Sequence, residues 1–216
     1  GGCSLQHMSS ESQIAHKQQT LVEQLAHNGV VCDHIIDPLT GPEYGYRHKA
    51  RLGVRFVPKK DKVLVGFRER NSSFITETQR CEVLHPSVGS IIGAMAECIN
   101  LLAAKRQIPQ IEVAVGDDRT VLVFRHLVEL EAADRAILKD FCEQHDLVAY
   151  LQAGKPDALE LLTAGEEQPL YYELSMPGDD AIRIEFQPSD FIQVNPEINR
   201  QMVRNAVEYL DLRPTD

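Results

Sequence analysis

Several features that would place a protein in a common class are absent from this sequence. No apolar run approaches the roughly 20 residues of a membrane-spanning helix, and the first residues lack the basic-then-apolar pattern of a signal peptide. No glycine-rich G-x-G-x-x-G turn occurs, which excludes a nucleotide-binding turn of that type within these 216 residues. We therefore expect a cytoplasmic protein with no membrane partner.

Cysteines are few and irregularly spaced. Their number is odd and none belongs to a C-x-x-C pair, which favours reduced thiols or metal ligands over a disulfide framework. The sequence has five: Cys3, Cys32, Cys81, Cys98 and Cys142. Cys32 falls in a predicted apolar strand, and Cys98 and Cys142 fall beside apolar residues in predicted helices. These three are interpreted as buried structural thiols.

Two C-x-x-x-H pairs leave a zinc site open as an alternative. Cys3 with His7 and Cys81 with His85 could supply a tetrahedral set of ligands. Neither pair has the tight spacing that is typical of zinc ligands. A zinc-stabilised structural domain is therefore a competing interpretation.

Positive charge is scarce overall but concentrated in one segment. The formal net charge is −10, which by itself argues against a polyanionic partner. Residues 46–70 nevertheless hold nine basic and two acidic residues, against 13 basic and 30 acidic residues elsewhere. Such a basic segment on an acidic body is typical of an electrostatically steered contact with a polyanion. A solvated hairpin with charges on its exposed face is the simpler alternative.

Hydrophobic periodicity predicts hairpins with helices between them. Strands are expected over 30–36, 50–57, 63–68, 73–76, 110–116, 120–126, 147–152, 158–163, 170–175 and 181–186. Helices are expected over 11–28, 86–106, 131–145 and 196–210. The apolar sides of the helices over 86–106 and 196–210 are expected to pack. This order predicts an α+β fold with a largely antiparallel sheet and packed helices.

Residues 186–195, Phe-Gln-Pro-Ser-Asp-Phe-Ile-Gln-Val-Asn, carry more than a strand-to-helix connection needs. Asn195 suits the N-cap of the following helix. Phe191 and Gln193 alternate on an extended segment, so they are expected to project to the same side. A flat ring beside an amide that both donates and accepts hydrogen bonds suits a planar heterocycle. From the residues alone, an ordinary core role for Phe191 is the simpler alternative.

The run F-x-P-x-D-F-I-Q-V-N-P resembles a hallmark of the RNA uracil-5-methyltransferases, which use S-adenosylmethionine to make 5-methyluridine. The resemblance covers essentially the whole sequence, including Y-R-H-K-A-R at 46–51 and G-F-R at 66–68. The opening G-G-C-S-L-Q-H resembles the end of the C-x5-C-x2-C run in the iron–sulfur members that act on 23S ribosomal RNA. The resemblance implies that Cys3 and Cys81 are two of the four ligands of a 4Fe–4S cluster, with the others before residue 1.

The same resemblance implies roles for single side chains. Gln193 would contact S-adenosylmethionine or the target base, and Phe191 would pack against a flipped-out uracil. The basic segment would face the RNA. The residues implied there are Arg47, Lys49, Arg51, Arg55 and Arg68.

The chemistry of this family needs groups that the sequence does not supply. A cysteine thiolate must add at C6 of uracil before C5 can attack a sulfonium methyl, and a base must then remove the C5 proton. No convincing nucleophile, base or glycine-rich turn is present. We therefore predict no catalytic residue here, and an inactive fragment that binds neither S-adenosylmethionine nor a cluster.

The expected organisation has three parts. Residues 1–8 are interpreted as a remnant of the iron–sulfur motif, 9–195 as a central RNA-facing α+β domain, and 196–216 as a helix leading into a missing methyltransferase domain. The expected partner is 23S ribosomal RNA, with no obligate protein partner. A non-catalytic RNA-binding module and a relative that acts on transfer RNA stay open as alternatives.

Overall fold

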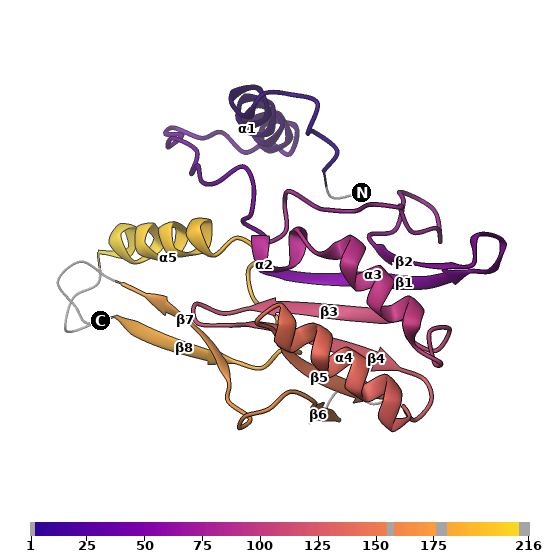
Figure 1. Cartoon of the computed structure of the whole chain (residues 1–216). Helices are drawn as coiled ribbons and strands as arrows, with labels where there is room; N and C mark the ends of the chain where they lie inside the picture. The colour runs from indigo at the N-terminus through magenta and orange to yellow at the C-terminus, as the bar shows by residue number, and fades with distance from the viewer. Residues whose placement is uncertain (1–2, 155–157, 176–180, 212–216) are drawn as a thin grey trace.

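A six-stranded sheet with the strand order β2-β1-β3-β4-β5-β6 forms the centre of the computed structural model, which describes residues 3–154, 158–175 and 181–211 (Figure 1). The strands of this sheet are β1 (Lys49–Val57), β2 (Lys62–Gly66), β3 (Gln110–Val115), β4 (Thr120–His126), β5 (Val148–Ala153) and β6 (Leu159–Leu161). A separate hairpin comprises β7 (Leu170–Leu174) and β8 (Ile182–Phe186). The helices are α1 (Ser10–His27), α2 (Pro86–Gly89), α3 (Ile92–Leu101), α4 (Ala132–Gln144) and α5 (Pro196–Leu210).

Neighbouring strands of the main sheet pair antiparallel except β4 and β5, which pair parallel. The parallel pair needs a crossover connection, and α4 provides it. The predicted α+β fold with a largely antiparallel sheet and packed helices is thereby confirmed.

The β1–β2 hairpin forms where the basic segment was expected to fold back. Leu52 and Val54 are buried, whereas Arg51 and Arg55, which alternate with them, are exposed. The chain turns through a 3-10 turn and then through Asp61, whose φ of 45° lies in the left-handed region that Asp tolerates.

Two hydrophobic cores lie on opposite faces of the sheet. The larger core fills the space between the sheet and α2, α3 and α4, with side chains such as Met95, Ile111 and Phe124 fully buried. The smaller core lies on the other face, where the β7–β8 hairpin covers β3, β4 and β5. Its buried members are Ala114, Val121, Val123, Tyr150, Leu170 and Phe186. The strands at the centre of the sheet are therefore buried on both sides.

The helix predicted over 86–106 is two helices, α2 and α3, and it ends at Leu101. The segment before it supplies the reason. The Cys81 N–H donates to the Gly89 carbonyl (2.9 Å), and the Gly93 N–H donates to the Gln79 carbonyl (3.0 Å). These bonds take up backbone groups that a continuous helix would have used internally.

Two predicted strands are wrong. Residues 30–36 are irregular, and Val31 is 87% exposed. The strand expected over 73–76 is reduced to a single bridge between Arg68 and Ile75. A short apolar run becomes a strand only where a neighbour can pair its backbone, and periodicity alone does not reveal that neighbour.

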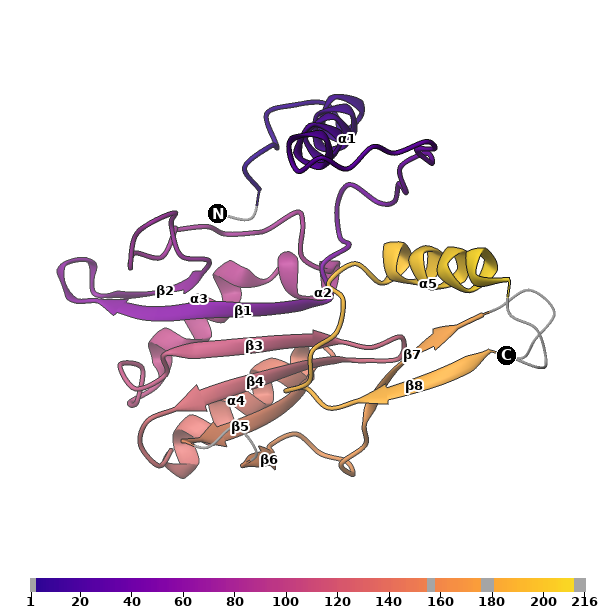
Figure 2. The same ribbon diagram turned by 180° about the vertical axis from the view of Figure 1, so that it is seen from behind.

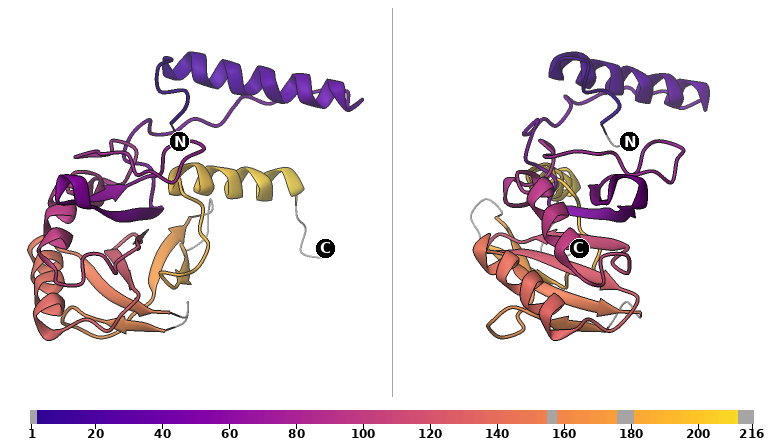
Figure 3. Two further views of the ribbon diagram at one scale, coloured as in Figure 1. Left: turned by 90° about the vertical axis from the view of Figure 1, so that its right-hand side faces the viewer. Right: turned by 45° about the vertical axis from the view of Figure 1, so that its right-hand side comes forward.

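The first and last helices begin as expected but bury little. Ser9 Oγ accepts the Ser12 N–H, and Asn195 Oδ1 accepts the Ile198 N–H (3.1 Å). Neither α1 nor α5 contains a buried residue, and both extend away from the sheet (Figure 3). The expected packing side of α5 is therefore wrong as a buried surface, because Leu210 is 65% exposed. No helix in the described ranges is long and apolar enough to cross a membrane.

Asp134 joins the end of α3 to the first turn of α4. Its side chain is 2% exposed, and its two carboxylate oxygens accept the N–H groups of Ala103 (2.8 Å) and Ala104 (2.9 Å). These N–H groups follow the last turn of α3, so the buried carboxylate supplies them with acceptors and ties the two helices together.

Replacing this carboxylate should destabilise the fold. Asp134→Ala removes two charge-assisted hydrogen bonds that a buried carboxylate accepts, so we expect the unfolding free energy to fall by about 2 to 4 kcal/mol. Urea denaturation followed by circular dichroism measures the loss. The exposed Asp140 of the same helix offers the control, since Asp140→Ala should cost less than about 0.5 kcal/mol. Equal losses in the two variants would contradict this account.

Candidate functional site

The loop that joins β8 to α5 (residues 187–195), called here the β8–α5 loop, lies across the sheet face opposite α3 and α4 (Figure 2). It begins with a tight turn. The Asp190 N–H donates to the Gln187 carbonyl (2.9 Å), and the Asp190 carboxylate accepts the Gln187 N–H (2.7 Å). Pro188 holds the second position of this turn, where its fixed φ is favourable.

The far end of the loop is joined to the start of β1. The His48 N–H donates to the Val194 carbonyl (2.9 Å), and the His48 carbonyl accepts the Val115 N–H (2.9 Å). Asn195 then caps α5. Both ends of the loop are therefore fixed by hydrogen bonds.

Side chains in the middle of the loop alternate in direction. Ile192 packs against the smaller core, whereas Phe191 is 84% exposed and Gln193 is also exposed. The expected alternation is present, and the core role for Phe191 is excluded by its exposure. Gln193 borders a small cleft together with His48 and Asn199.

A polar network lies beside this cleft. Arg200 Nη2 contacts both carboxylate oxygens of Asp117 (2.7 and 2.8 Å), and Arg200 Nε donates to the Glu173 carbonyl (2.9 Å). The Glu173 N–H donates to Asp117 (2.9 Å). This network fixes the start of α5 against the β3–β4 turn and β7. Sequence reasoning missed it, because Asp117 resembles an ordinary turn acid and its partners are distant in the chain.

Two histidines meet at the start of β1. The rings of His48 and His85 contact edge to face, with centroids 4.8 Å apart. Burial, with His85 adding to the effect, lowers the pKa of His48 to about 4, so this ring is neutral near pH 7. Burial also lowers the pKa of His85, whose Nδ1 lies 2.8 Å from Ser87 Oγ. Sequence reasoning considered His85 only as a zinc ligand.

Three of the five basic side chains implied in RNA contact project from the β1–β2 region into solvent. The Arg51 side chain is 69% exposed, with Nε 3.2 Å from Glu112 Oε1. Arg55 and Arg68 are exposed, and Arg55 Nη1 donates to the Ser73 carbonyl at 3.4 Å. These three arginines form what we call the arginine face.

The other two basic side chains are half-buried and have partners within the chain. Arg47 Nε donates to the Lys49 carbonyl (3.1 Å), and the Arg47 guanidinium lies 5.8 Å from the centre of the Phe67 ring. Lys49 Nζ donates to the Pro188 carbonyl in the β8–α5 loop. Arg47 and Lys49 therefore occupy a different environment from the arginine face.

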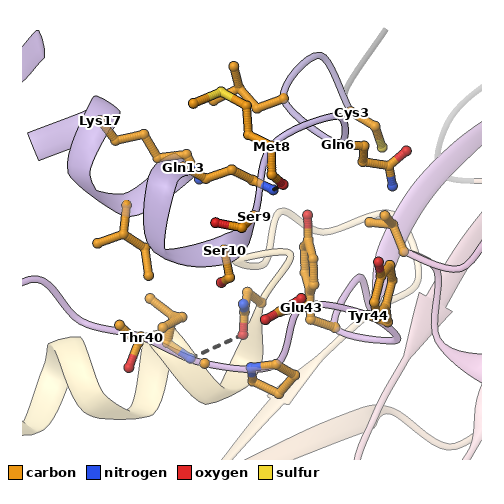
Figure 4. Close-up of a pocket in the computed structure, with 18 of the residues that line it drawn as sticks. Cys3, Gln6, Met8, Ser9, Ser10, Gln13, Lys17, Thr40, Glu43 and Tyr44 are labelled. Carbon is orange, nitrogen blue, oxygen red and sulfur yellow. Dashed lines mark hydrogen bonds between the residues drawn. The ribbon is translucent and has the colours of Figure 1, made fainter.

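The two cysteines implied as cluster ligands lie near the same tyrosine. Burial raises the pKa of Tyr46, and the neighbouring Cys3 and Cys81 thiols add to that rise. Both thiols are free, Cys3 exposed and Cys81 half-buried. Cys3 also borders a pocket of about 520 Å³ that opens between the start of α1 and the segment around Tyr44 (Figure 4). Two thiols are half of the ligand set of a four-thiolate cluster.

The zinc site is not formed. Within residues 3–154, 158–175 and 181–211, no group of three or more His, Cys, Asp or Glu side chains is placed to hold a metal. His85 packs instead against His48 and contacts Ser87.

The remaining cysteines agree only in part with expectation. Cys98 and Cys142 are buried, as predicted. Burial raises the pKa of Cys98 to about 12 and also raises that of Cys142, so neither supplies a thiolate near neutral pH. The prediction for Cys32 is wrong, because this thiol is exposed in the irregular segment where no strand forms.

Known proteins resemble the chain at the level of fold. No family model matches it. Among solved structures, the Pyrococcus abyssi tRNA (uracil-54, C5)-methyltransferase in complex with S-adenosyl-L-homocysteine superposes with a TM-score of 0.64. That comparison covers 96% of this chain and 50% of the other at 17% sequence identity, which shows a shared fold.

Curated sequences resemble the chain more closely. Relatives from Nitrosococcus oceani, Alcanivorax borkumensis and Francisella tularensis subsp. novicida are 49%, 46% and 44% identical over 99%, 99% and 100% of this chain. By this similarity the chain resembles one part of the RNA uracil-5-methyltransferases. All three relatives are named 23S rRNA (uracil(1939)-C(5))-methyltransferase RlmD. The chain spans about half the length of each, with coverage of 47%, 48% and 49%.

The depressed pKa of His48 should make stability depend on pH. Its ordinary value is 6.5 and its folded value about 4, so the unfolded chain binds more protons between these values. The contribution of His48 to the unfolding free energy should therefore fall as the pH decreases from 6.5 to about 4 and stay level below that. The groups facing this ring are His85, Asp117 and Arg200.

His48→Asn should remove this contribution. After allowance for partial solvent screening, we expect the pH dependence of stability to decrease by about 1 to 2 kcal/mol across the window. Urea midpoints of wild type and variant at pH 4, 5, 6 and 7 give the difference. The exposed His16 provides the control, because His16→Asn should keep the wild-type slope. If His48→Asn keeps the wild-type dependence of stability on pH, that dependence does not come from His48.

Proposed function

We propose that the chain is the central, RNA-facing part of an S-adenosylmethionine-dependent 23S ribosomal RNA uracil-C5-methyltransferase. The main support is the pairing of an exposed Phe191 and Gln193 on a loop that hydrogen bonds fix at both ends. The 44 to 49% identity to relatives with that name adds to this support. The same identity favours the ribosomal over the transfer RNA type. A ribosomal RNA substrate implies a protein of the cytoplasm.

In this proposal the loop forms one wall of a pocket for the target base. The Phe191 ring presents a flat apolar face on which a uracil extruded from the RNA stacks. The Gln193 carboxamide can donate to and accept from the uracil edge or from S-adenosylmethionine. The chain's part in the reaction is therefore to bind and orient the base.

The covalent steps belong to residues of a longer protein. S-adenosylmethionine supplies the methyl group when it is bound. Methyl transfer also needs a thiolate to add at uracil C6, and that thiolate has to come from outside the buried Cys98 and Cys142. We therefore propose that this chain alone is inactive, and that 196–216 lead into the catalytic domain. Of that range, 212–216 lie outside the described residues.

Residues 1–8 are proposed as the remnant of a cluster motif, of which 1 and 2 lie outside the described residues. Cys3 and Cys81 would hold two positions of a 4Fe–4S cluster, completed by two further cysteines of the longer protein. The proximity of both thiols to Tyr46 supports this assignment. The cluster's contribution there would be to cross-link distant segments.

The arginine face is proposed to contact RNA phosphates. Arg51, Arg55 and Arg68 lie on exposed parts of the β1–β2 region, in a protein that is otherwise acidic. Phosphate contacts position the RNA without reading its sequence. The choice of uridine then depends on the pocket wall and on the shape of the RNA.

Neutralising the arginine face should weaken RNA binding and its salt dependence. Changing Arg51, Arg55 and Arg68 to Gln should lower the slope of log K against log salt by about 0.7 to 0.9 for each phosphate that the variant no longer neutralises. Fluorescence anisotropy with a 23S ribosomal RNA fragment at several salt concentrations measures this slope. Lys139→Gln on α4 removes one charge from the opposite side and should leave the slope unchanged. A triple variant with the wild-type slope would contradict an RNA contact at this face.

A substitution at Gln193 in the β8–α5 loop should change the methylation rate more than the affinity for RNA. In the complete protein, we expect Gln193→Ala to lower the methylation rate by about 10- to 100-fold, the effect of removing one partner of a hydrogen-bonded pair. RNA affinity should change little. Transfer of labelled methyl groups from S-adenosylmethionine to RNA measures the rate, and Gln187→Ala provides a matched exposed amide in the same loop.

Two outcomes of this experiment count against the proposal. Equal methylation rates for Gln193→Ala and wild type would show that the Gln193 side chain does not help to bind or orient the base. Methyl transfer by the 216-residue chain alone would show that it contains the catalytic groups.

A further inference from the structure

Lys49 differs from the arginine face although it shares a strand face with two of its members. Lys49, Arg51 and Arg55 alternate along β1 and so leave the sheet on the same side. Arg51 and Arg55 are exposed, whereas Lys49 is half-buried. Its ammonium group donates to the Pro188 carbonyl, which lies 139 residues further along the chain.

The Pro188 carbonyl needs this partner. Pro188 is buried within the turn that opens the β8–α5 loop. The turn is closed by bonds between Gln187 and Asp190, which leave the carbonyl of Pro188 unused. A buried carbonyl without a donor costs free energy, and the Lys49 ammonium supplies that donor.

The residue before Lys49 holds the other end of the same loop. The His48 N–H donates to the Val194 carbonyl at 2.9 Å. Two neighbouring residues, one just before β1 and one at its start, thus hold positions 188 and 194, and Ile192 packs into the smaller core between them. Phe191 and Gln193 are the exposed side chains between these fixed points.

The charges around Lys49 suit an internal role. Glu112 and Asp190 are its acidic neighbours, and Arg51 is its basic neighbour. Burial lowers the pKa of Lys49, the reverse of what an exposed phosphate-binding cation needs. One of the three N–H donors of this ammonium is already taken by the Pro188 carbonyl.

We propose that Lys49 is a positioning residue, which holds the Pro188 carbonyl and thereby sets the pose in which Phe191 and Gln193 meet the target base. This assignment rests on the proposed function for its consequence in methylation. It replaces the implied RNA contact of Lys49 with a contact inside the protein.

Amide hydrogen exchange in this chain tests the contact without RNA. Lys49→Met keeps the aliphatic stem and removes the donor. We expect exchange at the Gln187 and Asp190 amides to rise at least about tenfold, because the turn loses a charge-assisted hydrogen bond. Amides of α3 should keep their rates, which shows that the variant is folded. Arg51→Met should leave exchange in the turn unchanged.

RNA binding and methylation complete the comparison. Lys49→Met should keep the wild-type salt slope of RNA binding, whereas Arg51→Met should lower it by about 0.7 to 0.9. In the complete protein, Lys49→Met should lower kcat about tenfold and change the KM for RNA by less than about twofold. Lys49→Arg retains a donor and should recover most of kcat.

The results that would overturn the assignment are specific. Unchanged exchange at Gln187 and Asp190 in Lys49→Met would show that the ammonium does not hold the turn. If Lys49→Met lowers the salt slope of RNA binding as much as Arg51→Met does, Lys49 contacts RNA and the assignment is wrong. If the wild-type protein binds no RNA, the proposed function fails, and exchange in the turn still decides whether Lys49 holds Pro188.

Discussion

Burial of β3 and β4 on both faces is the constraint on which the rest of the structure depends. On one face, side chains such as Ile111 and Phe124 pack against the helices. On the other, Ala114 and Val123 need a second cover, which β7, β8 and Ile192 provide. The β7–β8 hairpin covers only one end of the sheet. The β8–α5 loop then crosses the same face from β8 to the start of β1 (Figure 2). The loop thereby places the exposed side chains of Phe191 and Gln193 near the polar side of β1.

The second face of the sheet has an apolar part and a charged part. The apolar end carries the smaller core, while the end formed by β1 and β2 presents Arg51 and Arg55 to solvent. A protein with a net charge of −10 can therefore offer a locally basic surface. Nearby ion pairs limit it, since both Lys60 and Lys62 contact Glu77. The basic surface is consequently narrower than the count of basic residues indicates.

Local signals explain which parts of this structure could be predicted. The cap at Asn195 and the alternation of Phe191 with Gln193 depend on residues a few positions apart, and both are present. The contacts that sequence could not reveal join distant positions, such as Arg200 with Asp117 across 83 residues. The strand expected over 30–36 failed for the same reason, because pairing depends on a neighbour that the local pattern does not specify. The motif at 186–195 indicated which side chains would be exposed, but not what holds them.

The break between α2 and α3 constrains the neighbourhood of one predicted ligand. A Cβ atom at Gly89 would lie 2.4 Å from the Cys81 carbonyl oxygen, a separation that no side chain can accept. Position 89 therefore admits glycine alone, and main-chain contact rather than side-chain packing sets the distance between Cys81 and the helix pair. The point on the backbone from which that sulfur projects is thus set by main-chain contact with the first helix of the pair.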